Sequence, residues 1–218
     1  MEGLENIIKL GQPKGAFTHR PAGYTHEFYL TGTITSAEDY IEWFDTIRHA
    51  GENDLVKIYI NSEGGNLFTA VQFMRVLTDC HADVWISVEG ACMSAATMIM
   101  LCGDAYEISP HSMFMFHNYS GGTVGKGGEM YDNIVYERKW SERLLREVYK
   151  DFLTEEEIES ILNNKDLWME GDEILDRLRE KVKKYEDQTE EINGDEGQQS
   201  DLFDETSEEE LLGSRDTN

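Results

Sequence analysis

One apolar stretch constrains the fold of this chain more than any other part of its sequence. Residues 84–102 read VWISVEGACMSAATMIMLC, which is long enough for a membrane span. Glu89, Gly90 and a run of small residues interrupt the stretch, and they favour a buried strand, a tight turn and a helix instead. Ser94 lies at the turn, where the helix is expected to begin.

Other segments repeat this order of strand, turn and helix. Alternating apolar residues predict strands at 27–35, 55–61, 84–88, 106–109 and 112–117. Helical spacing predicts a helix after each of the first two strands, a long helix over 129–152, and a short one that starts at a capping box of Thr154 and Glu157. KDLWME, residues 165–170, fits either a loop or a strand. The predicted fold is therefore α/β, with a parallel-rich sheet and flanking helices.

Charge divides the chain into three parts. The sequence has 44 acidic and 19 basic residues, a formal net charge of -25, and residues 186–218 alone hold 13 acidic residues against one Arg. We interpret 186–218 as a disordered acidic tail, 1–24 as an N-terminal arm without a sustained period, and 25–185 as one domain. So negative a chain is a poor partner for nucleic acid or for an acidic membrane surface.

The cysteines and the first residues of the sequence indicate a reducing compartment. Cys80, Cys92 and Cys102 are odd in number and have no paired spacing, and MEGLENIIKL has no basic region followed by an apolar one. We therefore expect a cytoplasmic protein. No Gly-x4-Gly-Lys-Ser/Thr loop for ATP is present, and we expect neither a cofactor nor a metal.

Three features of the sequence could carry chemistry together. A serine is a weak nucleophile that needs a base and donors for the oxyanion, and Ser94 precedes free N–H groups at a helix start. His117 ends a predicted strand, at the edge where open α/β sheets place functional groups. Gly64 and Gly65 follow another strand. Each feature alone has an ordinary explanation: a capping serine, a structural histidine and a tight turn.

In combination, these residues resemble a known family. YINSEGG is followed 29 residues after Gly65 by Ser94 in GACMSAA, and then come MFMFHNYSGG and NNKDLWM. This order is similar to that of ClpP, the proteolytic subunit of the ATP-dependent Clp protease, whose motifs are Tyr-Ile-Asn-Ser-Pro-Gly-Gly, Gly-x-Ala-Ala-Ser-Met-Gly, Met-Ile-His-Gln-Pro-x-Gly-Gly and Arg-Asp. The similarity extends from about residue 26 to about residue 170.

The resemblance implies an activity and a role for each motif residue. Ser94 becomes the nucleophile, His117 the general base and Asp166 the carboxylate that orients the imidazole, while Gly65 and Ala95 donate hydrogen bonds to the oxyanion. It implies a serine endopeptidase that assembles into homo-oligomeric rings and cleaves unfolded polypeptides through an acyl-enzyme. An AAA+ unfoldase is the implied partner.

The chain departs from the family pattern at several positions. Glu63 replaces the motif proline, Asn118 and Tyr119 replace Gln-Pro, and Ala95 with Ala96 replaces Met-Gly. GDEILDRLREKVKK replaces the usual closing sequence and predicts a helix there. Together with the acidic tail, these departures suggest a divergent member of phage type.

Three alternatives stay open at this stage. One is crotonase-type acyl-CoA chemistry on the same general fold, which does not require Ser94 and His117 together. The second is an assembly protein of this fold without catalytic activity. The third is a viral head maturation-type protease that acts on one assembly instead of degrading unfolded polypeptides in general.

Overall fold

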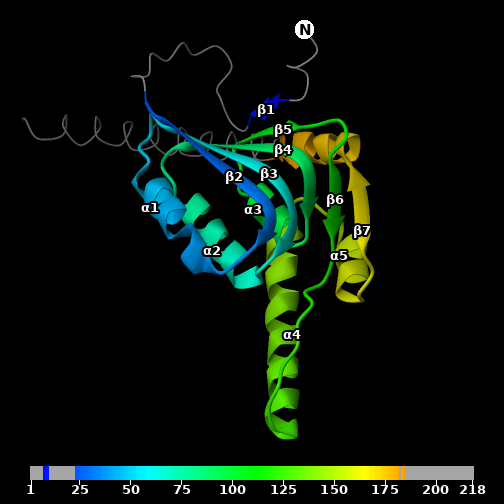
Figure 1. Ribbon diagram of the computed structural model, residues 1–218. Helices are drawn as coiled ribbons and strands as arrows, with labels where there is room; N and C mark the ends of the chain where they lie inside the picture. Colours follow the sequence, from blue (N-terminus) through cyan, green and yellow to red (C-terminus); the bar gives the residue numbers. More distant parts are fainter. Residues whose placement is uncertain (1–6, 10–22, 182, 185–218) are drawn as a thin grey trace, which may run out of the picture.

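The computed structural model describes residues 7–9, 23–181 and 183–184. In these residues, seven strands form one mixed sheet with the order β1-β5-β4-β3-β2, and β6 and β7 join it beside β4 (Figure 1). Pairing is parallel except where β1 meets β5 and β7 meets β6, so the predicted parallel-rich α/β fold is confirmed. The strands are Ile7–Lys9 (β1), Thr25–Ile34 (β2), Leu55–Gly65 (β3), Asp83–Met93 (β4), Ala105–Ile108 (β5), Met113–Phe116 (β6) and Leu167–Glu170 (β7).

One part of the core lies between this sheet and three helices on one side of it, and the core continues into buried residues of the segment 145–178. Strand β3 alternates in burial: Val56, Ile58 and Ile60 are buried, whereas Lys57 and Tyr59 on its other face are partly exposed. The buried face is covered by α1, α2 and α3 (Figure 1). These helices are Ile41–His49 (α1, preceded by the short 3-10 helix η1, Ala37–Tyr40), Leu67–Thr78 (α2) and Ala95–Met100 (α3).

Strand β4 divides its pairing between two neighbours. Its first half pairs with β5 and its last residues pair with β6, which in turn pairs with β7. Gly90 lies between the two halves of β4, where a β-carbon would come 2.6 Å from Oδ1 of Asn61. The ends of β4 and β6 and the beginning of β7 consequently meet at one edge of the sheet.

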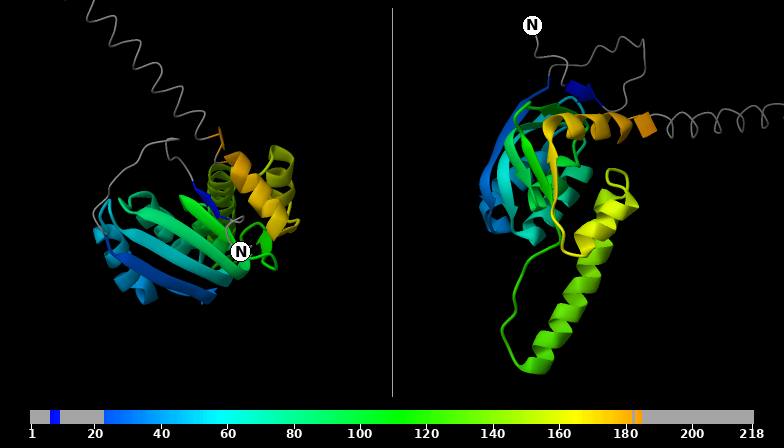
Figure 2. Two further views of the ribbon diagram at one scale, coloured as in Figure 1. Left: turned by 90° about the horizontal axis from the view of Figure 1, so that it is seen from above. Right: turned by 90° about the vertical axis from the view of Figure 1, so that its right-hand side faces the viewer.

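A long helix projects from this body. Helix α4 (Gly127–Tyr149) begins far from the sheet and ends beside it, and the segment that follows β6 runs along it (Figures 1 and 2). Helix α5 (Glu155–Leu162) starts at the predicted capping box, in which Thr154 Oγ1 accepts from the N–H of Glu157 and the Glu157 carboxylate accepts from the N–H of Thr154. A last helix covers residues 171–181, as the sequence predicts.

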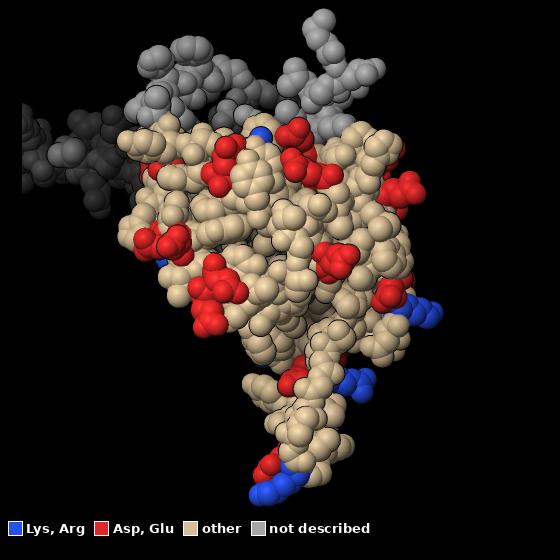
Figure 3. Space-filling model, in the orientation of Figure 1, with Lys and Arg blue, Asp and Glu red and all other residues tan. Residues whose placement is uncertain are grey.

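The predicted elements are confirmed with two additions. Strand β4 continues past residue 88 to the serine turn, and residues 7–9 of the predicted arm form β1. The segment 165–170, open between loop and strand, contains β7. The tail at 186–218 lies outside the described residues, so its disorder and the domain boundaries stay predictions. Figure 3 shows acidic side chains spread over one face of the body, with few Lys and Arg.

Candidate active site

Ser94 occupies a strained turn between β4 and α3. Its φ of 55° and ψ of -127° fall in a region that residues other than glycine rarely adopt. The Ser94 N–H donates to the carbonyl of Met115 at 2.8 Å, and its carbonyl accepts from the N–H of Thr97 at 3.0 Å. The Ser94 side chain makes no capping hydrogen bond to α3. The ordinary explanation, a helix-capping serine, is therefore wrong.

The Ser94 hydroxyl meets His117 instead. His117 follows the last residue of β6, and its Nε2 lies 2.6 Å from Oγ of Ser94, with both residues half-buried. Strand β6 sets this distance, because its Met115 binds the N–H of Ser94 two residues before the imidazole. In the tautomer with its proton on Nδ1, His117 accepts the serine proton on Nε2. Two of the predicted site residues are thus brought together.

The backbone of Asp166 lies close to His117, but the Asp166 side chain makes no hydrogen bond or ion pair with the described residues of this pair. In the antiparallel ladder of β6 and β7, Phe116 is paired with Leu167, and one more step of the same register sets His117 opposite Asp166. The Asp166 side chain is exposed, and among the described residues no hydrogen bond or ion pair joins it to His117. Its role in orienting the imidazole stays a prediction.

Gly64 and Gly65 form the end of β3, paired with β2, and not the expected tight turn; Gly64 packs directly on the serine. A β-carbon on Gly64 would lie 2.7 Å from Cβ of Ser94 and 3.0 Å from the backbone nitrogen of Ala95, and Gly64 has a φ of +92°. Gly65, with a φ of +147°, faces β2, where its β-carbon would be 2.2 Å from the carbonyl oxygen of Ile34. Only glycine fits at both positions. The predicted donors of the oxyanion site, Gly65 and Ala95, thus belong to segments in contact beside Ser94.

Two polar residues that sequence reasoning did not single out hold the end of β3 in place. Ser62 is buried; its hydroxyl donates to the carbonyl of Gly32 at 2.6 Å and accepts from the N–H of Gly64 at 3.1 Å. Asn61 Oδ1 accepts from the N–H of Ala91 at 3.0 Å, where the register between β3 and β4 shifts. Both belong to YINSEGG, but Gly32 and Ala91 each lie 30 residues from the side chain that binds them, so the motif gave no sign of these two contacts.

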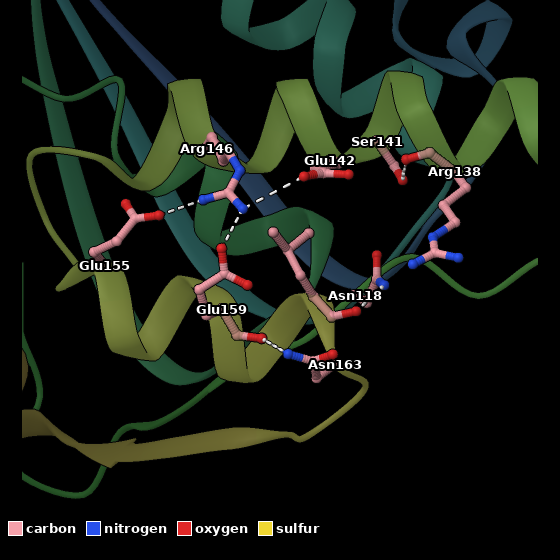
Figure 4. Close-up of polar contacts among 9 residues, drawn as sticks. Asn118, Arg138, Ser141, Glu142, Arg146, Glu155, Glu159 and Asn163 are labelled. Atoms are coloured by element: carbon pink, nitrogen blue, oxygen red, sulfur yellow. Dashed lines mark hydrogen bonds and ion pairs between the residues drawn. The ribbon is translucent and has the colours of Figure 1, made fainter.

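The segment after His117 is fixed at the start and lines a groove. Asn118 Nδ2 donates to the carbonyl of Leu162 at 3.3 Å and to Oδ1 of Asn164 at 3.2 Å, which ties the segment to the turn after α5. Figure 4 shows the first of these contacts, with Arg138 pointing from α4 toward the same segment. The groove beside it is lined mainly by Tyr119, Gly121, Gly122, Ile134, Arg138 and Asn164.

An ion-pair network holds α5 against α4 below this groove. Arg146 of α4 binds the carboxylates of Glu155 and Glu159 on α5, and lies 3.4 Å from Glu142 on its own helix (Figure 4). The Asn163 side chain donates to the carbonyl of Glu159 at 2.8 Å, at the end of α5. These contacts fix the turn to which Asn118 is tied.

The geometry and the family comparison lead to one conclusion. A mostly parallel α/β sheet that holds a serine and a histidine at one edge is the architecture expected of a ClpP-like protein. The sequence model of the Clp protease family matches residues 30–177, more than half of the chain, so this protein belongs to the Clp protease family. A comparison with curated proteins gave no significant match. Of the helices in the described part of the chain, none has the length and apolar character needed to cross a membrane.

Proposed function

We propose that this chain is a serine endopeptidase, a ClpP-like subunit of a self-compartmentalised ring protease that cleaves unfolded polypeptides. The observation that carries the proposal is the 2.6 Å distance between Oγ of Ser94 and Nε2 of His117. The Ser94 hydroxyl makes no capping hydrogen bond to α3 that would explain its presence. Membership of the Clp protease family supports a peptidase reaction.

The proposed reaction is acyl transfer through Ser94. Its hydroxyl attacks the peptide carbonyl while His117 takes the proton, and the imidazolium then gives that proton to the leaving amine. The N–H groups of Gly65 and Ala95 donate to the oxyanion. Water, deprotonated by the same imidazole, hydrolyses the acyl-enzyme and restores the serine. Asp166 orients His117 by accepting a hydrogen bond from Nδ1–H of the imidazole, which keeps that proton.

The groove after His117 suits an extended peptide. The segment that lines it carries Gly121, Gly122 and Gly125, and a β-carbon on Gly122 would have no neighbour within 4 Å. A glycine-rich backbone lets a substrate main chain pair with it as an added strand, so side-chain selectivity should be loose. Gly127 and Gly128, which follow in the sequence, belong to α4.

Assembly into rings is part of the proposal. The projecting half of α4 exposes Tyr131, Ile134 and Tyr136, each at least half accessible to solvent in the single chain. Exposed apolar side chains on a projecting helix support association with other copies. Rings would enclose the sites and restrain an unselective protease, and an AAA+ unfoldase is the partner that the family implies.

The test is covalent labelling with a fluorophosphonate, followed by mass spectrometry of the modified residue. We expect labelling at Ser94 that Ser94→Ala and His117→Ala abolish. Matched controls are Ser36→Ala, which removes a serine that makes no capping bond, and His111→Ala at the other end of β6. An assembled protein that stays unlabelled, beside an active homologous protease as control, would favour the inactive assembly protein.

A second assay separates the two protease alternatives. A ClpP-like enzyme should cleave short peptides and, with an unfoldase or after denaturation of the substrate, unrelated polypeptides. A maturation-type protease should leave unrelated polypeptides intact although Ser94 is labelled. The crotonase alternative has no use for the Ser94–His117 contact and predicts no labelling.

A further inference from the structure

The carbonyl of Ser94 is held by a second donor besides the backbone. Thr97, in the first turn of α3, donates from Oγ1 to this carbonyl at 2.7 Å, in addition to its N–H at 3.0 Å. Thr97 is completely buried. Because the Ser94 turn is strained, it persists only where its surroundings determine it, and these two bonds fix the peptide group that follows the nucleophile.

The Thr97 hydroxyl is itself held by a residue on α4. Its Oγ1 lies 2.7 Å from the hydroxyl of Tyr149, which is also buried. A threonine hydroxyl has one proton, and the Ser94 carbonyl can only accept, so Tyr149 is the donor to Thr97. A phenol is protonated at neutral pH, and burial raises the pKa of Tyr149 further, so its hydroxyl can act as this donor. A chain of two hydrogen bonds thus runs from Tyr149 through Thr97 to Ser94.

Tyr149 also contacts the strand that carries the histidine. Its ring meets that of Phe116 edge-on, with centroids 5.5 Å apart and an interplanar angle of 81°. Phe116 is fully buried and immediately precedes His117. One side chain at the end of α4 therefore supports both members of the pair: the hydroxyl acts on the serine turn and the ring on β6.

We propose that Tyr149 and Thr97 are positioning residues, which keep Ser94 Oγ within reach of His117 during acylation. The inference rests on the proposed serine peptidase function, but its hydrogen-bond chain includes neither Gly65 nor Asp166; it holds the peptide group whose N–H belongs to Ala95. Neither residue touches the substrate, so their effect should appear in the rate of the chemical step and not in substrate affinity.

The decisive variant is Tyr149→Phe, which removes only the hydroxyl. Its matched control is Tyr106→Phe, because Tyr106 is equally buried and its hydroxyl donates to the carbonyl of Gly103 at 2.6 Å, away from Ser94. Loss of one neutral hydrogen bond should slow fluorophosphonate labelling of Ser94 and lower kcat on a peptide by about three- to tenfold, with KM unchanged. Tyr106→Phe should leave both values as in the wild type.

Variants of Thr97 test the order of the chain. Thr97→Val should slow labelling at least as much as Tyr149→Phe, Thr97→Ser should restore it, and the double variant Tyr149→Phe/Thr97→Val should be no slower than Thr97→Val alone. Wild-type rates in Tyr149→Phe, an equal loss in Tyr106→Phe, or fully additive effects would each overturn the inference.

A readout without catalysis separates this inference from the proposed function. Amide hydrogen exchange of a peptide spanning residues 92–98 should be faster in Tyr149→Phe than in Tyr106→Phe, whether or not the protein hydrolyses peptides. If wild-type Ser94 is never labelled, the peptidase proposal fails. Faster exchange in Tyr149→Phe would even then show that Tyr149 stabilises the Ser94 turn. Unchanged exchange would contradict that role.

Discussion

Gly64→Ala is the sharpest test of how closely the end of β3 packs on Ser94. A β-carbon there would lie 2.7 Å from Cβ of Ser94 and 2.6 Å from the carbonyl oxygen of Met93, and the residue would keep a φ of +92°. Gly32→Ala is the matched control, because Gly32 has a φ of +76° but no atom within 4 Å of the added carbon. The two variants share the conformational penalty and differ in the clash.

The expected magnitudes follow from this difference. A left-handed residue other than glycine costs about 1–2 kcal/mol, which both variants bear. Overpacking adds about 1–3 kcal/mol for Gly64→Ala alone, giving a total of about 2–5 kcal/mol. To reach ordinary contact at 3.4 Å, the two β-carbons must also separate by a further 0.7 Å. A displacement of that size at a nucleophile costs on the order of 10²-fold in rate.

The assays are urea denaturation and fluorophosphonate labelling, both at one fixed protein concentration. Gly64→Ala should unfold at a lower urea concentration than Gly32→Ala, by about 0.5–1.5 M for a slope of about 2 kcal/mol/M. Its labelling at Ser94 should fall steeply, whereas Gly32→Ala labels at nearly the wild-type rate. If the two variants label equally fast, Gly64 does not pack on the nucleophile as described.

Three further predictions concern other charges and thiols. Asp166→Asn should slow acylation by on the order of 10⁴-fold if Asp166 orients His117, as measured by labelling, whereas Asp172→Asn should not. The hydrogen bonds from Arg177 lower the pKa of Glu157, so this ion pair stabilises the fold above about pH 4.5 and is lost as the pH falls through the lowered pKa. Glu157→Gln should therefore flatten the fall of the thermal midpoint between about pH 5 and pH 3, and an unchanged slope would contradict this role. Cys102 is half-buried, and desolvation raises its pKa to about 12, so its thiol should react slowly with a disulfide reagent at neutral pH and faster after denaturation; fast reaction in the native protein would contradict the raised pKa.

The sequence predicts the framework of this site better than its details. Alternating apolar residues indicated the strands, and the motif resemblance selected Ser94 and His117, which the fold brings within 2.6 Å. Local patterns predict strands and turns because each of these elements is formed by consecutive residues. The position of Asp166 was harder to predict, since it depends on the pairing of β6 with β7, and the segment 165–170 fitted a loop as well as a strand.

Contacts between distant residues lie beyond what one sequence can indicate. Thr97 and Tyr149 are 52 residues apart, and each alone fits an ordinary buried position of a helix. Nothing in the letters around Ser62 indicates that its hydroxyl spans Gly32 and Gly64. The strain at Ser94 is equally invisible in a sequence, because it results from bonds to Met115 and Thr97 that form only in the folded chain.

That strain provides a last prediction, which separates a catalytic serine from a structural one. At φ 55° and ψ -127°, Ser94 occupies the backbone region of the first central residue in a type II′ turn, where glycine dominates. Ser94→Ala and Ser94→Gly both lack the hydroxyl, so they should both be unreactive toward a fluorophosphonate, but only the alanine keeps a strained β-carbon.

The two variants should therefore differ in stability, and the usual order, in which alanine is more stable than glycine, should be reversed. Glycine relieves about 1–3 kcal/mol of backbone strain and loses about 0.4–1 kcal/mol through the greater freedom of the unfolded chain, so Ser94→Gly should be the more stable by about 1 kcal/mol in urea denaturation. That result would mean that the fold alone favours glycine, and that a hydroxyl is maintained there at a cost in stability, as expected for a nucleophile. A Ser94→Ala variant as stable as Ser94→Gly would show that the turn is not strained and would remove this support for a catalytic role.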